Sequence, residues 1–135
     1  MELPELFQML IKQTVQLKHE EMKKHDFSDV NFSLLQYILN IGEFDNLTFS
    51  DLAEKMNITK PAVTASIQKL IEKGLVTKQQ SLEDKRIFYL SLTEKGQEVF
   101  KVSKIANSKL EEMIRRKLSR DEVEQLRFLL AKVFT

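Results

Sequence analysis

The sequence predicts a mainly α-helical chain that carries one small β-hairpin. Its 135 residues include only three glycines and two prolines, whereas loop-rich sheet folds need many more residues that tolerate turn conformations. Apolar residues recur at the spacing of an amphipathic helix along most of the chain. Between residues 75 and 92 the pattern changes to β-branched and aromatic segments with a period of two.

Two helices are expected in the first third of the chain. Residues 3–24 carry apolar residues at i, i+3, i+4 and i+7, which predicts one long amphipathic helix. A stripe of about six turns is long for a small domain, so we expect part of it to meet a partner subunit. After a connector at residues 25–29, a second helix is predicted over residues 32–41, and Gly42 is the expected stop signal.

Two capped helices joined by a short turn follow. Thr48 is the expected N-cap of a short helix over residues 49–56. The turn at residues 57–59 ends in a second N-cap residue and opens a helix over residues 60–73. Gly74 then lies where glycine commonly ends a helix.

The rest of the chain predicts the hairpin and two more helices. Strands are expected at residues 75–79 and 87–92, with a polar, charged tip between them. Thr93 is the expected N-cap of a long helix over about residues 94–117. Ser119 begins a capping box that opens the final helix.

Short helix, turn, second helix and hairpin is the element order of a winged helix-turn-helix, whose second helix enters the major groove of DNA. On this reading the chain divides into an N-terminal dimerisation helix at residues 1–30, a DNA-binding domain at residues 31–95 and C-terminal dimerisation helices at residues 96–135. The long apolar seams of the terminal helices favour a homodimer. A twofold dimer predicts a pseudo-palindromic site on double-stranded DNA.

The second helix of the pair has an outward side of small and polar residues. Small side chains allow close approach to a groove about 12 Å wide, and free N–H groups at the start of the helix are expected to meet phosphate. For this helix taken alone, an outer face that only contacts water is the alternative. The candidate DNA-binding residues here are Thr59, Lys60, Pro61, Ala62, Thr64, Ala65, Gln68 and Lys69.

The formal net charge of +1 conceals an uneven distribution along the chain. Residues 1–46 carry four basic and eight acidic side chains, residues 47–95 carry eight and six, and residues 96–135 carry nine and six. An acidic first third and a mildly basic remainder are compatible with DNA as a partner, although such charges usually belong to solvated faces.

Composition argues against several other functions. With no cysteine, the chain has no disulfide, thiolate nucleophile, Cys-ligated metal or thiol redox sensor. His19 and His25 do not share one helical face, so no metal or cofactor is expected, and no catalytic constellation can be assembled for an enzyme. No uncharged stretch approaches the roughly 20 residues of a membrane span. The first residues lack the basic start of an export signal, so a cytoplasmic location is expected.

Three short motifs carry a family resemblance. Residues 84–86 read Asp-Lys-Arg in the predicted wing, residues 92–96 read Leu-Thr-Glu-Lys-Gly, and residues 70–76 read LIEKGLV. With them, residues 47–96, LTFSDLAEKMNITKPAVTASIQKLIEKGLVTKQQSLEDKRIFYLSLTEKG, resemble the winged helix-turn-helix of the MarR (multiple antibiotic resistance regulator) family of transcription factors. The flanking helices match in number and order, so the resemblance covers essentially the whole chain.

The resemblance implies a DNA-binding regulator, most commonly a repressor, whose wing residue Arg86 enters the minor groove. Asp84 would orient the wing by pairing with Arg86 or its backbone, while Lys78 and Lys85 would approach phosphates. An ordinary surface ion pair is the alternative for Asp84 and Arg86. Many family members carry arginine or another long polar residue where this chain has Ala65. Base contacts would then come mainly from Lys60, Thr64, Gln68 and Lys69.

The resemblance also implies a small effector, often aromatic or acidic, that binds between the dimerisation helices and the winged domain and releases DNA. For each candidate pocket residue, plain hydrophobic core is the alternative. A winged helix that binds another protein, without affinity for DNA, is the alternative function. The candidate pocket residues are Phe7, Leu10, Ile11, Phe32, Leu35 and Leu39.

Overall fold

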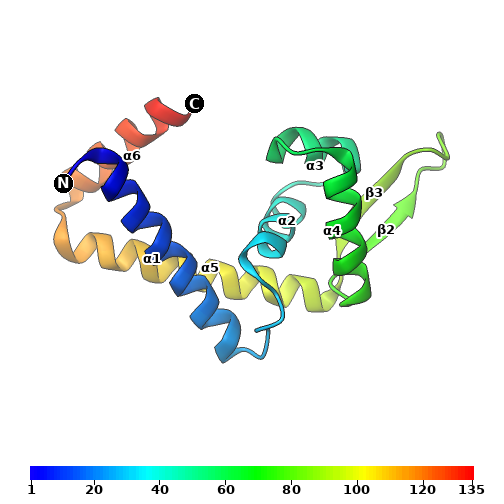
Figure 1. Ribbon diagram of the computed structural model, residues 1–135, viewed down its shortest axis with the longest axis horizontal. Helices are drawn as coiled ribbons and strands as arrows, with labels where there is room; N and C mark the ends of the chain where they lie inside the picture. Colours follow the sequence, from blue (N-terminus) through cyan, green and yellow to red (C-terminus); the bar gives the residue numbers. More distant parts are fainter.

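A computed structural model of the chain describes all 135 residues as six helices and a small three-stranded sheet (Figure 1). The longest helix, α5, packs against α2 and the sheet near its start and against α1 and α6 further along. The elements in chain order are α1 (Leu3–Lys24), α2 (Phe32–Glu43), β1 (Leu47–Thr48), α3 (Phe49–Met56), α4 (Lys60–Glu72), β2 (Val76–Gln80), β3 (Phe88–Leu92), α5 (Glu94–Lys117) and α6 (Arg120–Phe134).

The predicted starts of α3, α5 and α6 are confirmed, and side-chain caps account for them. The Thr48 hydroxyl accepts a hydrogen bond from the N–H of Asp51 at 3.1 Å, and the Asp51 carboxylate accepts one from the N–H of Thr48 at 3.0 Å. Ser119 and Glu122 form the same reciprocal box at the start of α6. Thr93 caps α5. Such caps satisfy N–H groups that the helix itself leaves without partners.

The prediction that Gly42 ends the second helix is wrong, because α2 continues to Glu43. Gly42 lies inside the helix, at a point where a Cβ atom would overlap the ring of Phe100 on α5. The glycine is therefore needed for the close approach of α2 and α5, and its position near the end of a helix is incidental.

The sheet has a third strand that the sequence pattern did not predict. β1 pairs antiparallel with β3, which gives the strand order β1-β3-β2. β2 and β3 form the predicted hairpin, and each begins one residue later than expected. α4 likewise ends at Glu72, one residue early, a difference within the usual uncertainty of helix ends.

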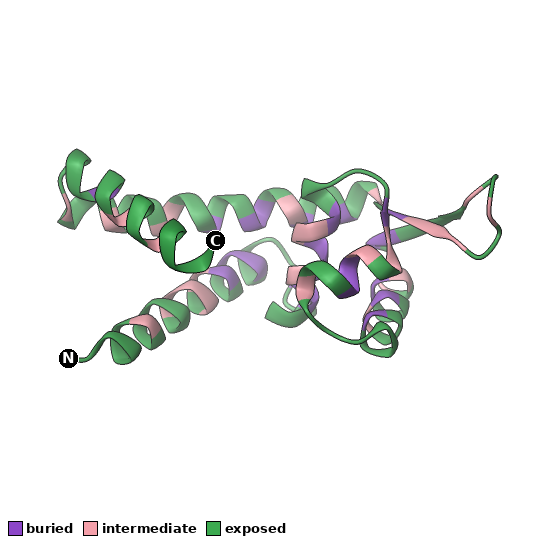
Figure 2. Ribbon diagram, turned by 90° about the horizontal axis from the view of Figure 1, so that it is seen from above, coloured by how far each residue is buried: buried purple, intermediate pink, exposed green.

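The hydrophobic core lies where α2, α3, α4 and the sheet meet the first part of α5. It contains 19 buried side chains in one cluster, and Figure 2 shows the buried segments gathered there, whereas the ends of α1 and α6 are mostly exposed. This core fixes α3, α4 and the wing relative to one another. Its largest fully buried side chains include Leu35, Ile38, Leu52, Ile67 and Leu70.

The base of the wing and the start of α5 are in direct contact. The Thr93 hydroxyl donates to the carbonyl of Gly74 at 2.6 Å, and the N–H of Thr93 donates to the carbonyl of Leu75 at 3.0 Å. Gly96 lies so close to that Leu75 carbonyl that a Cβ atom would overlap it. The glycine of the Leu-Thr-x-x-Gly motif thus permits α5 to pack on the backbone at the base of the wing.

Polar side chains tie α1 to α5. The ammonium of Lys18, only 5% exposed, donates to the Ser103 hydroxyl at 2.9 Å. The nearly buried carboxylate of Glu21 accepts hydrogen bonds from Lys109 and Lys24. The hydrogen bond from Lys109 is the main cause of the lowered pKa of Glu21. The Lys18–Ser103 and Glu21–Lys109 contacts join α1 to α5, whereas Lys24 lies on α1 itself.

The free ends of α1 and α6 expose apolar side chains. A groove of about 680 Å³ runs between α1, α5 and α6, and 12 of its 14 lining residues are hydrophobic. None of the helices combines the length and the apolar character that crossing a bilayer requires. Side chains more than half exposed here are Leu3, Met9, Ile11, Phe128, Leu129, Val133 and Phe134.

Candidate nucleic-acid interface

Helix α4, the predicted recognition helix, buries one face and exposes the other. Val63, Ile67 and Leu70 point into the core, because their spacing places them on one side of the helix. The opposite side has no packing partner, and α4 stands beside the wing at one end of the molecule (Figure 1). All eight candidate residues of this segment are exposed: Thr59, Lys60, Pro61, Ala62, Thr64, Ala65, Gln68 and Lys69.

The start of α4 leaves some of its backbone N–H groups free. The Thr59 hydroxyl already accepts the hydrogen bond of the Ala62 N–H at 3.3 Å, and Pro61 has no N–H. The N–H groups of Thr59 and Lys60 have no hydrogen-bond partner within the chain and remain for a phosphate. The N-cap and the proline that start the helix account for the other two donor positions of its first turn.

Two polar side chains on the outer face of α4 have partners within the helix. The Thr64 hydroxyl donates to the carbonyl of Lys60 at 3.0 Å. The Gln68 amide donates to the Glu72 carboxylate at 3.4 Å, a long contact that a better acceptor can replace. Gln68 is therefore the side chain on this face most able to exchange its present partner for a base edge.

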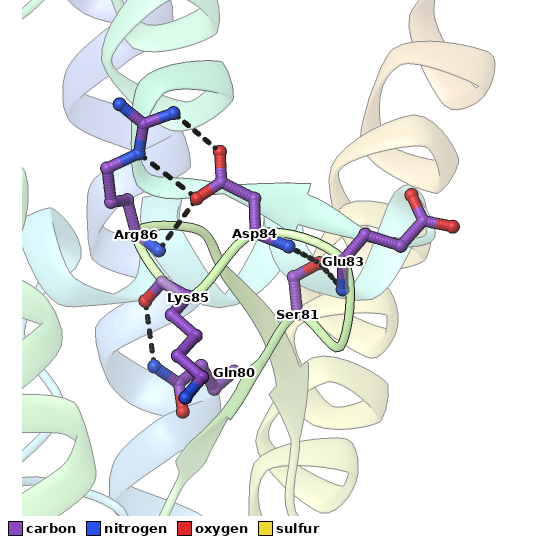
Figure 3. A network of polar contacts seen from close by, with 6 residues as sticks. All are labelled: Gln80, Ser81, Glu83, Asp84, Lys85 and Arg86. Carbon is purple, nitrogen blue, oxygen red and sulfur yellow. Dashed lines mark hydrogen bonds and ion pairs between the residues drawn. The ribbon is translucent and has the colours of Figure 1, made fainter.

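The wing tip is a braced turn (Figure 3). The Ser81 hydroxyl accepts hydrogen bonds from the N–H groups of Glu83 at 3.2 Å and Asp84 at 3.3 Å. On the other side of the tip, the Gln80 amide donates to the carbonyl of Lys85 at 2.7 Å. The sequence pattern did not single out Ser81 or Gln80, although a serine two residues before acidic turn residues is a recognised turn former.

Asp84 holds Arg86 in a fixed orientation, which confirms the predicted pairing. Its carboxylate accepts from the backbone N–H of Arg86 at 3.0 Å, from Nε at 3.1 Å and from a terminal guanidinium nitrogen at 3.0 Å (Figure 3). The Arg86 side chain is nevertheless 90% exposed. Two of its five guanidinium N–H groups face Asp84, so the other three are available to an external acceptor.

The electrostatics of this pair keep both groups charged at neutral pH. The hydrogen bonds from Arg86 lower the pKa of Asp84 below its ordinary value, and the same contact raises the pKa of Arg86. Lys78 and Lys85 add exposed cations on the wing, with the Lys78 ammonium 4.9 Å from the centre of the Phe88 ring. Lys78, Lys85 and Arg86 therefore present positive charge on the wing beside the exposed carboxylate of Glu83, while Asp84 holds Arg86 in place.

The six predicted pocket residues are not brought together. Phe7 and Leu10 line the groove between α1, α5 and α6, whereas Phe32 and Leu35 line a separate cavity of about 180 Å³ between α1 and α2. The two pairs of residues lie apart because the N-terminal part of α1 runs away from α2 (Figure 1). The remaining two residues lie outside both cavities: Ile11 is exposed, and Leu39 packs on the core.

Sequence comparisons identify the same family as the motifs. The model of the MarR family matches residues 30–88. An uncharacterised HTH-type transcriptional regulator of Bacillus subtilis, YdgJ, is 31% identical over 101 residues, which cover 75% of this chain and 60% of the relative. The homoprotocatechuate degradative operon repressor of Escherichia coli is 24% identical over 109 residues, which cover 81% of this chain and 72% of that protein.

Solved structures share the fold over nearly the whole chain. FabT of Streptococcus pneumoniae, in complex with DNA, superposes with a TM-score of 0.87 at 22% identity, covering 97% of this chain and 92% of FabT. A Staphylococcus aureus MarR, in complex with salicylate and kanamycin, gives a TM-score of 0.81 at 23% identity, covering 96% and 86% of the two chains. The chain therefore matches the MarR family model over residues 30–88 and shares the fold of these solved structures over nearly its whole length.

Proposed function

We propose that this chain is a transcription regulator that binds double-stranded DNA as a twofold dimer. The observation that carries the proposal is the pairing of an unpartnered recognition-helix face with a braced, outward-facing arginine on the adjacent wing. In this arrangement α4 lies in the major groove and Arg86 in the neighbouring minor groove. Repression is the proposed direction of control, because one relative is named as an operon repressor. The proposal carries with it the cytoplasmic location expected from the sequence.

Selection from a random-sequence library of duplexes tests this proposal. Repeated binding and amplification on the wild-type protein are expected to enrich a pseudo-palindrome whose half-sites lie about one helical turn apart. Fluorescence anisotropy would then measure affinity and stoichiometry, with two chains per duplex expected. A library that enriches no sequence, or a chain that binds a protein partner and no duplex, would favour the alternative of a protein-interaction module.

The terminal helices supply the proposed dimer interface. The apolar groove between α1, α5 and α6, and the exposed apolar residues around it, have no covering element within one chain. Exposed apolar surface of this extent favours association, and a twofold axis would place the same surface of a second copy against it. This proposal retains the predicted division into terminal dimerisation helices and a central DNA-binding domain.

We expect Leu129→Glu to convert the dimer into monomers. Leu129 is half exposed and lines the apolar groove, so the substitution places two like charges in the proposed interface. Operator affinity should fall by about a hundredfold or more, because the second half-site loses its tether. Sedimentation velocity and anisotropy measure the two effects. Gln125→Glu, which adds the same charge to an exposed position of α6, is the control and should remain dimeric; a dimeric Leu129→Glu would refute the assignment of this interface.

We also propose that a small acidic effector acts through the cavity between α1 and α2. The cavity is lined by Lys18 as well as by Phe32 and Leu35. Burial, and then the charge of Lys104, lower the pKa of Lys18, so a carboxylate in the cavity would relieve an unfavourable environment for the ammonium. Salicylate is the carboxylate probe of choice, since a structural neighbour was solved with it.

Lys18→Met is expected to make DNA binding insensitive to salicylate. Methionine keeps the apolar length of the side chain but removes the charge that would pair with the carboxylate. Anisotropy titrations of salicylate into the protein–operator complex measure release. Lys12→Met, an exposed position on the same helix, controls for loss of charge and should release DNA as the wild type does. Equal release by wild type and Lys18→Met would rule out this cavity as the effector site.

A further inference from the structure

One large apolar side chain in the DNA-binding half of the molecule is left entirely in solvent. Leu82, at the tip of the wing, is 99% exposed, more than any other large hydrophobic residue of the chain. Every other large apolar side chain that is more than half exposed lies at the N-terminal end of the chain or in α6. Those residues belong to the proposed dimer surface. The wing between β2 and β3, which carries Leu82, lies at the opposite end of the molecule from α6 and the start of α1 (Figure 1).

The backbone around Leu82 is fixed. Leu82 follows Ser81. The Ser81 hydroxyl accepts hydrogen bonds from the N–H groups of Glu83 and Asp84, and these bonds close the turn that contains Leu82. The N–H of Ser81 donates to the carbonyl of Ile87 at 2.8 Å at the base of the loop. Asp84, two residues after Leu82, orients Arg86 (Figure 3). Leu82 and Arg86 therefore belong to one braced loop.

A single exposed leucine is common on protein surfaces, so exposure alone does not indicate a function. The location of Leu82 on the same loop as Arg86 is the informative feature. When Arg86 occupies the minor groove, a residue four positions away on the same short loop is within reach of the wall of that groove. The wall is formed by deoxyribose C–H groups, and apolar side chains are a recurrent means of contact in the minor groove. Packing there removes apolar surface from water, a contribution that salt does not screen.

We infer that Leu82 is a DNA-contacting residue, which packs on the deoxyribose wall of the minor groove beside Arg86 and adds salt-insensitive affinity. This inference rests on the proposed function, because it requires the wing to sit in the minor groove. Within the wing tip, Arg86 then supplies the charge-dependent part of the affinity for DNA. Leu82 supplies an apolar part that does not depend on the DNA sequence.

Leu82→Ser, with Leu82→Met as the rescue variant, tests the inference. The probe is the duplex enriched by selection on the wild-type protein, measured by anisotropy across a salt series. Leu82→Ser is expected to weaken binding by about tenfold, since two wings each lose part of a buried leucine. The slope of log affinity against log salt should not change, because no cation is removed. Leu82→Met should restore affinity to within about threefold of wild type, as methionine keeps most of the apolar area.

The thermal midpoint of Leu82→Ser should equal that of the wild type, because the side chain makes no packing contact within the chain. Unchanged affinity of Leu82→Ser on the selected duplex would overturn the inference and leave the proposed function intact. An altered salt slope, or a change in oligomeric state by sedimentation, would also overturn it, because Leu82 would then act through Arg86 or through a protein contact. A wild-type protein that binds no duplex would overturn both the proposed function and this inference.

Discussion

Arg86→Ala is expected to weaken operator binding by about a hundredfold. Hydrogen bonds to charged groups contribute roughly 1.5–3 kcal/mol each, a dimer presents two wings, and about 1.4 kcal/mol corresponds to a factor of ten. The guanidinium is already oriented by Asp84 and keeps three N–H groups free. Little side-chain freedom therefore remains to be lost when DNA binds. Anisotropy on the selected duplex measures the change.

The salt dependence of DNA binding by the same variant distinguishes affinity lost with the charge of Arg86 from affinity lost with the geometry of its guanidinium group. Removing one cation per wing should reduce the magnitude of the slope of log affinity against log salt by about 0.9 for each wing. Arg86→Lys should keep the wild-type slope but lose part of the affinity, because an ammonium cannot reproduce the planar pairing with Asp84. Lys132→Ala, in an exposed position of α6, should leave both quantities unchanged. Full affinity in Arg86→Ala would refute the role assigned to the wing.

Gly96→Ala is expected to lower the free energy of unfolding by about 3 kcal/mol, within the range found for overpacked sites. In an ordinary helix this substitution stabilises by up to about 1 kcal/mol. Here the new Cβ atom would overlap the carbonyl of Leu75, a backbone atom that also accepts the N–H of Thr93. Because backbone cannot turn aside as a flexible side chain can, the base of the wing or the start of α5 has to shift.

Urea unfolding at one fixed protein concentration measures this loss, since a dimer's stability depends on concentration. Ser108→Ala, at an exposed position of the same helix, is the matched control and should change the free energy of unfolding by less than about 0.5 kcal/mol. Gly74→Ala should fall between the two: its φ of +74° disfavours alanine by about 1–2 kcal/mol, but no atom lies within 4 Å of the added Cβ. A Gly96→Ala variant as stable as Ser108→Ala would show that the close approach of residue 96 to the Leu75 carbonyl does not restrict the side chain at this position.

Features with local causes were predictable from the sequence. The N-caps at Thr48, Thr59 and Ser119 act within three residues of themselves, so the starts of α3, α4 and α6 agree with expectation. The pairing of Asp84 with Arg86 is also local, since only one residue separates the partners. The caps follow from the residues themselves, and the pairing was implied by the family resemblance.

Features that depend on distant parts of the chain were not predictable. The role of Gly42 depends on Phe100, more than fifty residues away. The short strand β1 is recognisable only from its pairing with β3, because its two residues also resemble the start of a capped helix. The predicted pocket residues separate because the path of α1 away from α2 is set by contacts with α5. Amphipathic spacing identifies the buried face of a helix but not the element that covers it.

The central claim is that the α4 face and the Arg86 wing together bind DNA in a sequence-specific manner. The most direct test is the affinity of the wild-type protein for the selected duplex and for pooled random duplexes across one salt series. The account predicts tight binding to the selected duplex, weak binding to the random pool, and affinities for both that fall linearly on a logarithmic scale as salt increases. Binding that is absent, or independent of salt on both duplexes, would contradict it.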